Sequence, residues 1–445
     1  MRSRADLNVY ADEILKKANA DQTEVLVYSE NSALTRFSNE EIHQNVAEIN
    51  TSISMRSVTG KKIGMSSSNL IEDGNADIIV STSENNARLS PEDPYFNSLP
   101  ISTPIKTNMS QIDMETKASP SWRADIVSKI IDRSKRSGLT AAGSVSITNS
   151  EVVVANSLGS RASGGLGEIR VNAVIMSEDS SGYADYFGKN IESLEIENLI
   201  DAAIEKALSS ASPKSIDPGK YTVILEPPAV ADMIGFLAYA GLGALSVQEK
   251  RSFMVDNLGK EMISDLVTVR DDAGDDRTIG LPFDFEAVPK EAVYFFENGK
   301  ATGIVYDSYT ANKENRISTG HALPAGSGIG PMPLNLILET GNTSLSNMIA
   351  STEKGILVSR FHYTNLEDPL KTVFTGMTRD GTFLIENGKI SGGLKNLRFT
   401  QSIVNALKDV TAVSTEGRLS DSFLGATFTP ALKIDKFNFT GATEF

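Results

Sequence analysis

The sequence predicts an α+β fold, in which an N-terminal α/β domain with an internal duplication is followed by a β-rich C-terminal domain with one long buried helix. Three observations predict it. A helix, hairpin, strand pattern occurs twice in the first 211 residues, two Glu-Asn-Gly-Lys turns mark hairpins in the second half, and residues 229–247 form a long apolar run. The length of 445 residues is typical of two or three domains with a large core.

The first copy of the repeated pattern begins with a helix. Residues 6–18 place apolar side chains on one helical stripe, and residues 24–28 then form a short β-rich run. A polar stretch extends to Val46, and the strand-like segment 49–58 turns at Gly60. We therefore expect helix, hairpin and long strand in this order.

The second copy repeats that order further along the chain. Apolar residues at 126–131 form a helical stripe, and two strand-like runs follow. Asn-Ser pairs at 31–32 and 149–150 lie 118 residues apart, and Glu-Ile pairs at 48–49 and 168–169 lie 120 apart. The spacing indicates an internal duplication. Chance recurrence of a common α+β pattern is the alternative.

Two proline-rich segments divide this half of the chain. Residues 89–122 contain five prolines and little periodicity, which predicts a loop or lid. Residues 193–209 have the spacing of a helix with one buried face, and the chain then enters a stretch with Pro213, Pro218 and Gly219. We place the domain boundary there, giving an N-terminal α+β domain with the internal duplication at 1–211 and a C-terminal β-rich domain at 219–445.

The second half opens with an apolar strand at 221–227 and the long helix near 229–249. Residues 229–247 carry only Asp232 as a charge and are almost long enough to cross a bilayer, so a membrane helix is the alternative to a buried one. Asn-Gly pairs predict β-hairpins at 293–307 and 382–394, because both residues tolerate positive φ. A helix at 399–410 and a β segment at 431–439 complete the expected elements.

Composition excludes several classes of function. The chain has no cysteine, so it has no disulfide framework, no thiolate nucleophile and no zinc site built on sulfur. We expect a reducing cytoplasm, and the N-terminus lacks the apolar core of a signal peptide. The net charge of −15 argues against direct nucleic-acid binding. We expect no membrane partner.

Histidine and glycine residues provide the candidate site. The three histidines lie too far apart in sequence for a helical zinc motif, and His43 is interpreted as a surface or structural residue. His321 precedes a glycine-rich stretch that could line a peptide cleft or could be a flexible crossing. His362 lies between aromatic residues on an expected strand, where a structural role is the alternative. The candidate cavity-lining residues are His321, Gly320, Gly326, Gly328 and His362.

Other motifs fail on their chemistry. The acidic run at 271–276 lacks the alternation of a calcium loop, and the glycines at 326–330 lack the strand of a dinucleotide-binding motif. Residues 376–382 space glycines like a phosphate loop but have no lysine, and no serine lies in a nucleophile elbow. Motifs alone therefore identify no catalytic centre.

Longer segments resemble a known family. The segment TRFSNEEIHQN at 35–45 and the turn at 58–64 resemble the N-terminal signature of the TldD/PmbA family. Further similar segments are 245–273, 297–311, 319–322 and 381–407, in family order along nearly the whole chain.

This resemblance implies a cytoplasmic zinc metallopeptidase that works as a pair of subunits. The TldD-type subunit carries His-Glu-x-x-x-His, whose imidazoles bind zinc, and a late cysteine contributes to the site. The corresponding residues here, 235–240, read Gly-Phe-Leu-Ala-Tyr-Ala. The resemblance thus points to a PmbA/TldE-type subunit with no cofactor of its own and with zinc in its TldD-type partner.

Three functions follow as expectations. The first is a non-catalytic subunit that forms part of a cavity in which unfolded peptides are cut. The second is a homodimer that binds peptides or a protein without cutting them, as for family members described as DNA gyrase modulators. The third is an independent hydrolase that uses other residues.

Overall fold

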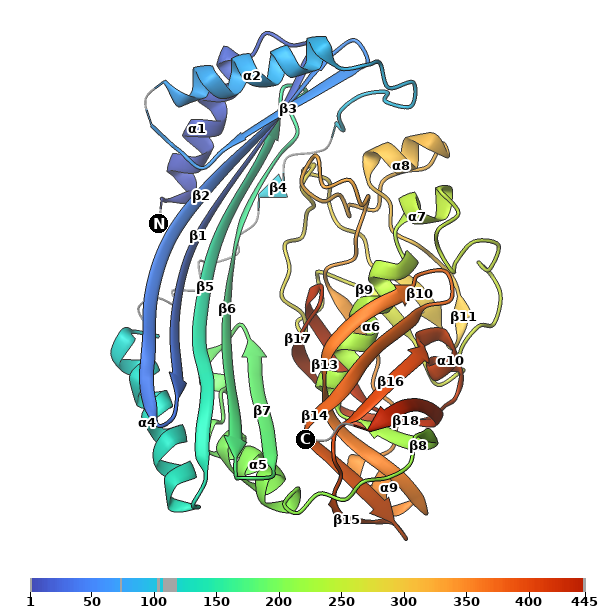
Figure 1. The fold of residues 1–445 in the computed structure, drawn as a ribbon. Helices are drawn as coiled ribbons and strands as arrows, with labels where there is room; N and C mark the ends of the chain where they lie inside the picture. The colour runs from blue at the N-terminus through green and yellow to red at the C-terminus, as the bar shows by residue number, and fades with distance from the viewer. Residues whose placement is uncertain (1, 73, 102–104, 107–117, 443–445) are drawn as a thin grey trace.

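The computed structural model describes residues 2–72, 74–101, 105–106 and 118–442. The strands form two sheets, one from β1–β7 and one from β8–β18. Figure 1 shows the long, curved strands of the first sheet beside the shorter strands of the second. The α+β class predicted from the sequence is confirmed.

The first sheet is antiparallel through its long strands. Its order is β3-β2-β1-β5-β6, and β6 also pairs with β7 and, in parallel, with the short β4. Its strands are β1 (Gln22–Ser38), β2 (Glu41–Thr59), β3 (Lys62–Ser68), β4 (Ile105–Lys106), β5 (Thr140–Asn156), β6 (Arg161–Met176) and β7 (Ser181–Gly188).

The element order repeats as the predicted duplication requires: helix, three antiparallel strands, helix. The equivalent strands β1 and β5 pair at the centre, and Asn31 lies directly opposite Asn149. The residues 118 positions apart therefore meet near the pseudo-twofold axis between the copies. The Glu-Ile pairs follow a different offset, because Glu48 pairs with Ser32 whereas Glu168 pairs with Thr148. Their spacing of 120 is two residues out of the structural register.

Within the described part of the chain, four helices cover one face of this sheet: α1 (Arg4–Lys17), α2 (Asn75–Leu89), α4 (Pro120–Arg136) and α5 (Ile196–Ser209). The predicted stripe of α5 is confirmed by the burial of Ile196, Ile200 and Ala203. Leu208, which the spacing also placed on the stripe, is 55% exposed. A single turn of 3-10 helix, η1 (Ile191–Ser193), precedes α5.

Two predictions for the first half need correction or lie partly outside the described residues. The polar stretch before Val46 is not a break: β2 starts at Glu41, and the hairpin turns at Asn39 and Glu40, which both have positive φ. Residues 41–50 are mostly exposed on both faces, so they show no alternation. Of the predicted loop at 89–122, residues 102–104 and 107–117 are outside the described residues, and α4 already begins at Pro120.

The second sheet has the order β11-β10-β9-β12-β18-β16-β14-β13-β8, with β15 on β14 and β17 on β18. Because β18 also pairs with β8, five strands close a ring (β8, β13, β14, β16 and β18). Its strands are β8 (Gly219–Leu225), β9 (Val269–Asp271), β10 (Val293–Glu297), β11 (Lys300–Ala301), β12 (Leu336–Leu338), β13 (Lys354–Asp368), β14 (Val373–Glu386), β15 (Lys389–Gly393), β16 (Leu397–Ser402), β17 (Val410–Ser422) and β18 (Gly425–Ala442).

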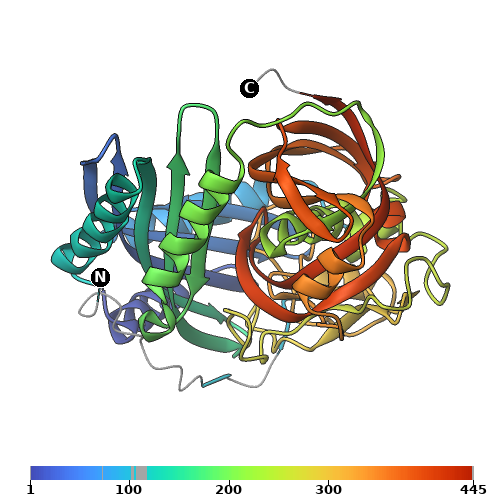
Figure 2. The ribbon, with the colours of Figure 1, turned by 90° about the horizontal axis from the view of Figure 1, so that it is seen from below.

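The predicted single helix at 229–247 is wrong in its length. The chain forms α6 (Pro227–Gly241) and then α7 (Ala244–Gln248). The break lies at Gly243, where a Cβ atom would stand 2.2 Å from the carbonyl oxygen of Pro331. The core position of α6 is as predicted: it packs against β13, β17 and β18, and Figure 2 shows it among their strands. No described helix is both long and apolar enough to cross a membrane.

Both Asn-Gly turns are confirmed. Asn298 and Gly299 join β10 to β11, and Asn387 and Gly388 join β14 to β15, all four with positive φ. The second arm of the first hairpin is only two residues long. The helix expected at 399–410 is also shorter: β16 occupies its first part and α10 (Ile403–Lys408) the rest. The short helices α8 (Ser308–Lys313) and α9 (Leu345–Ala350) complete the fold.

Candidate functional site

A cavity of about 890 Å³ opens where the two sheets meet. It is lined by the β6–β7 turn, by the connection after α5, and by β13, β14 and the segment 394–396. Its volume is in the range of pockets that bind small ligands. His362, one of the residues predicted from the sequence, lies on its wall.

An ion pair on the second sheet forms part of this wall. Arg360 on β13 donates from Nε to Oδ2 of Asp380 on β14 at 2.9 Å, and a second guanidinium nitrogen contacts the same oxygen. The other carboxylate oxygen of Asp380 accepts a hydrogen bond from the Ser181 hydroxyl at 2.7 Å. The guanidinium of Arg360 also lies 4.2 Å from the ring centre of Tyr183. Asp380 thus links the two sheets.

A bulge in β14 directs these side chains. Val358 pairs with Thr382 and Arg360 with Arg379, so Ser359 faces both Asp380 and Gly381. Asp380 and Gly381 both have positive φ, and a Cβ atom at Gly381 would lie 2.5 Å from the Ser359 hydroxyl oxygen. Glycine is required there by the backbone and by the close approach of β13.

Two further groups line the cavity beside this ion pair. Arg379 lies opposite Arg360, and its Nε is 3.9 Å from Oδ1 of Asp380. The ring of His362 stacks on Tyr363 with centroids 4.3 Å apart. Burial lowers the pKa of His362, and the charges of Arg379 and Arg360 lower it further. His362 is therefore neutral at pH 7 and can accept a hydrogen bond.

Sequence reasoning missed Arg360, Arg379 and Asp380. The segment 376–382 has the glycine spacing of a phosphate loop, but its Arg-Asp-Gly order at 379–381 lies at the β14 bulge. No single stretch of sequence predicts the cavity, because its walls come from segments around residues 180, 211, 360, 380 and 395.

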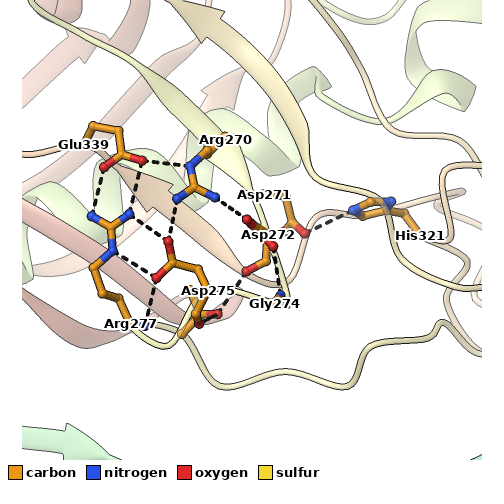
Figure 3. Close-up of polar contacts among 9 residues, drawn as sticks. Arg270, Asp271, Asp272, Gly274, Asp275, Arg277, His321 and Glu339 are labelled. Atoms are coloured by element: carbon orange, nitrogen blue, oxygen red, sulfur yellow. Dashed lines mark hydrogen bonds and ion pairs between the residues drawn. The ribbon is translucent and has the colours of Figure 1, made fainter. Parts of the chain in front are cut away.

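His321, the other histidine predicted to line a cavity, lies in the interior with 1% of its surface exposed. Its Nε2 is 3.0 Å from Oδ1 of Asp271 (Figure 3). Its Nδ1 is 2.8 Å from the carbonyl oxygen of Thr319. Burial raises the pKa of Asp271, but the hydrogen bond and charge of His321, the charge of Lys290 and the backbone hydrogen bond from Asn335 together lower it, and the net shift is downward. Both ring nitrogens of His321 are thus engaged within the chain, and its role in peptide handling stays a prediction.

A network of two arginines and three carboxylates lies next to this pair (Figure 3). Arg270 contacts Glu339, Asp272 and Asp275 at 2.5–2.7 Å, and Arg277 contacts Asp275 and Glu339. The hydrogen bond from Arg277 holds the pKa of Asp275 well below its usual range. Asp272 and Asp275 of the acidic run at 271–276 therefore bind arginine side chains, which agrees with rejecting a calcium loop.

The predicted glycines lie in different surroundings. Gly320 is buried against the carbonyl oxygen of Pro289, whereas Gly328 is exposed. Gly326 lines a second cavity of about 220 Å³ together with Glu24 and Arg56 of the first sheet. The structure does not bring these glycines and His362 into one cavity, and their contact with peptides stays a prediction.

The segment 235–240 on α6 is apolar and is buried except at Tyr239, which is 41% exposed. Gly235 lies beneath Ser422, and Phe236 stacks on Phe423 with ring centres 4.7 Å apart. Tyr239 meets Phe423 edge-on. Neither an imidazole nor a carboxylate is present in this segment, so its side chains do not fit a zinc ion. Over the described part of the chain, no cluster of three or more His, Asp or Glu side chains has the geometry to hold a metal.

Similarity to known proteins was found at two levels, in the sequence of about half of the chain and in the fold of nearly the whole chain. Residues 218–441 match the family described as the PmbA/TldA metallopeptidase C-terminal domain. A metalloprotease of Methanocaldococcus jannaschii is 26% identical over 238 residues, which are 52% of this chain and 51% of that protein. The metalloprotease PmbA of Escherichia coli O157:H7 is 25% identical over 271 residues, 59% and 57% of the two chains. The chain thus matches little more than half the length of these relatives.

The crystal structure of TldE from Thermococcus kodakarensis has the same fold. It aligns with a TM-score of 0.85 and 21% identity over 99% of this chain and 100% of that one. At this identity the likeness establishes the fold alone.

Proposed function

This chain belongs to the family of PmbA/TldA metallopeptidases, and we propose that it is the PmbA/TldE-type, non-catalytic subunit of a cytoplasmic TldD/TldE-like zinc metallopeptidase. The family resemblance read from the sequence is confirmed. In the proposed complex a TldD-type partner supplies the zinc, and this chain supplies part of the cavity that holds an unfolded peptide.

One observation carries the proposal. The family resemblance places the zinc-binding motif at residues 235–240, and this helix segment offers only apolar side chains, a phenol and a glycine. Zinc in a peptidase is held by imidazole and carboxylate ligands, with one position open for water. In this segment of α6, Phe236 packs on Phe423 and provides no atom that could bind zinc. A chain with this segment needs a partner for hydrolysis.

The junction of the two sheets supports a role in binding. The cavity of about 890 Å³ has both apolar lining, such as Met176 and Leu394, and charged groups such as Arg360 and Arg379. This mixture suits an extended peptide, whose backbone and side chains need both polar and apolar contacts.

Co-expression tests the proposal. This chain is produced with a TldD-type protein that carries His-Glu-x-x-x-His, and the copurified pair is assayed for cleavage of an unfolded protein such as casein. We expect cleavage by the pair, none by this chain alone, and loss of cleavage when the partner's motif glutamate is replaced. A pair that never copurifies, or cleavage by this chain alone, contradicts the proposal. A stable homodimer that binds peptides without a partner would favour the regulatory alternative.

A further inference from the structure

The cavity at the junction of the sheets holds a cation without a close counter-ion. The Arg379 side chain is 44% exposed, and its one ion pair within the described chain is the 3.9 Å contact with Asp380. Asp380 is already used: one oxygen accepts two contacts from Arg360, and the other accepts the Ser181 hydroxyl. A guanidinium in this state is available for a second carboxylate.

Neighbouring groups lie on the same side of the β13–β14 ladder. Arg360 faces Arg379, and His362 follows Arg360 by two residues, which puts both on one face of β13. The arginine charges that lower the pKa of His362 also stabilise an anion at the same place. Thr382, 1% exposed and also on the cavity wall, has a hydroxyl with no hydrogen-bond partner among the described residues.

We propose that this cavity binds a carboxylate of an unfolded peptide, with Arg379 as the principal ligand and with His362 and Arg360 shaping the site. The inference rests on the proposed peptide-binding function and names what is recognised. A carboxylate matches the planar fork of a guanidinium. Glu178 and Asp179 on the exposed β6–β7 turn, with Asp380 inside, disfavour ligands with several negative charges.

A peptide offers a carboxylate at its C-terminus or on an acidic side chain, and the experiment separates these sources. Isothermal titration of the purified full-length chain uses N-acetylated, otherwise uncharged peptides of one sequence. The first ends in a free carboxylate, the second in an amide, and the third in an amide with one internal glutamine replaced by glutamate. We expect one carboxylate peptide to bind at least about tenfold more tightly than the uncharged amide.

Variants locate the site. Arg379→Gln should abolish the carboxylate preference, and Arg136→Gln, at the exposed end of α4, should leave it unchanged. If Arg379→Gln does not fold, Arg379→Lys replaces it and should lower the preference, because lysine keeps the charge but loses the fork. The circular dichroism spectrum of each variant reports folding.

Three results overturn the inference: equal affinity for all three peptides, no binding at millimolar concentrations, or a preference that survives the loss of Arg379. Copurification of the wild-type chain with a TldD-type partner is measured separately. A wild-type chain that pairs but shows no carboxylate preference contradicts this inference and leaves the proposed function standing. Loss of pairing by the wild-type chain contradicts the proposed function.

Discussion

The packed interior of the second sheet and the cavity at its edge use polar groups in opposite ways. In the interior, the hydrogen-bonding groups of His321 and Asp271 are satisfied within the chain, and α6 presents almost only apolar side chains. In the cavity, Arg379 is half exposed and 3.9 Å from its counter-ion. The interior groups therefore maintain the fold, and the cavity groups are available to a ligand.

Removing an α6 side chain should have the largest effect. Leu237 is fully buried in the core of the second sheet, so Leu237→Ala is expected to cost about 2–5 kcal/mol of unfolding free energy. Denaturant unfolding measures this. Leu208→Ala, at an exposed position on α5, is the matched control and should change stability by less than about 0.5 kcal/mol. Equal stabilities of the two variants would show that α6 is not buried as described.

The second prediction concerns the interior histidine. His321→Ala leaves one oxygen of the buried Asp271 without its hydrogen-bond donor, so we expect a loss of about 1–3 kcal/mol. His362→Ala, on the cavity wall, should cost less. Thermal and denaturant unfolding of both variants provides the comparison. If His321→Ala keeps wild-type stability but lowers peptide cleavage in the paired complex, His321 belongs with the functional groups and the division between interior and cavity fails.

The third prediction concerns Asp232, the one charged residue of α6, and the pH dependence of the free energy of unfolding. Burial raises the pKa of Asp232 from 3.8 to about 7, Arg360 opposes that rise and Asp421 adds to it. Because the folded-state pKa is above the unfolded one, the stabilising contribution of Asp232 is present below pH 3.8 and is lost as the pH rises through 7. Relative to Asp232→Asn, the wild-type chain should therefore lose stability between pH 4 and 7. A difference that is constant over this range would contradict the raised pKa.

The smallest effect on stability is expected in the cavity. Arg379→Gln removes an exposed charge with no close partner, so its unfolding free energy should stay within about 0.5 kcal/mol of wild type. Denaturant unfolding at two salt concentrations checks this. A loss comparable to that of His321→Ala would mean that Arg379 is structural.

Sequence patterns predicted the elements that depend on local chemistry. The stripe of α5 and the two Asn-Gly turns needed only side-chain spacing and positive φ. Strand β2 was truncated in the prediction because its residues 41–50 have no buried face to impose alternation. The end of α6 depends on the carbonyl of Pro331, almost ninety residues from Gly243, and cannot be read locally.

The site was predictable only in part for the same reason. His362 was found because a histidine is conspicuous, but the exposure of Arg379 and the occupation of Asp380 depend on a bulge and on Ser181 from the other sheet. His321 looked equally promising, since the sequence does not reveal that Asp271 lies beside it.

We propose that this chain binds the peptide and that its zinc-carrying partner cleaves it. The zinc content of the purified chain tests this division most directly. Elemental analysis follows expression in zinc-containing medium and dialysis against a weak chelator. Because residues 235–240 carry no zinc-binding side chain, we expect fewer than about one zinc per ten chains. One zinc per chain, retained through dialysis and accompanied by peptide cleavage, would contradict the account.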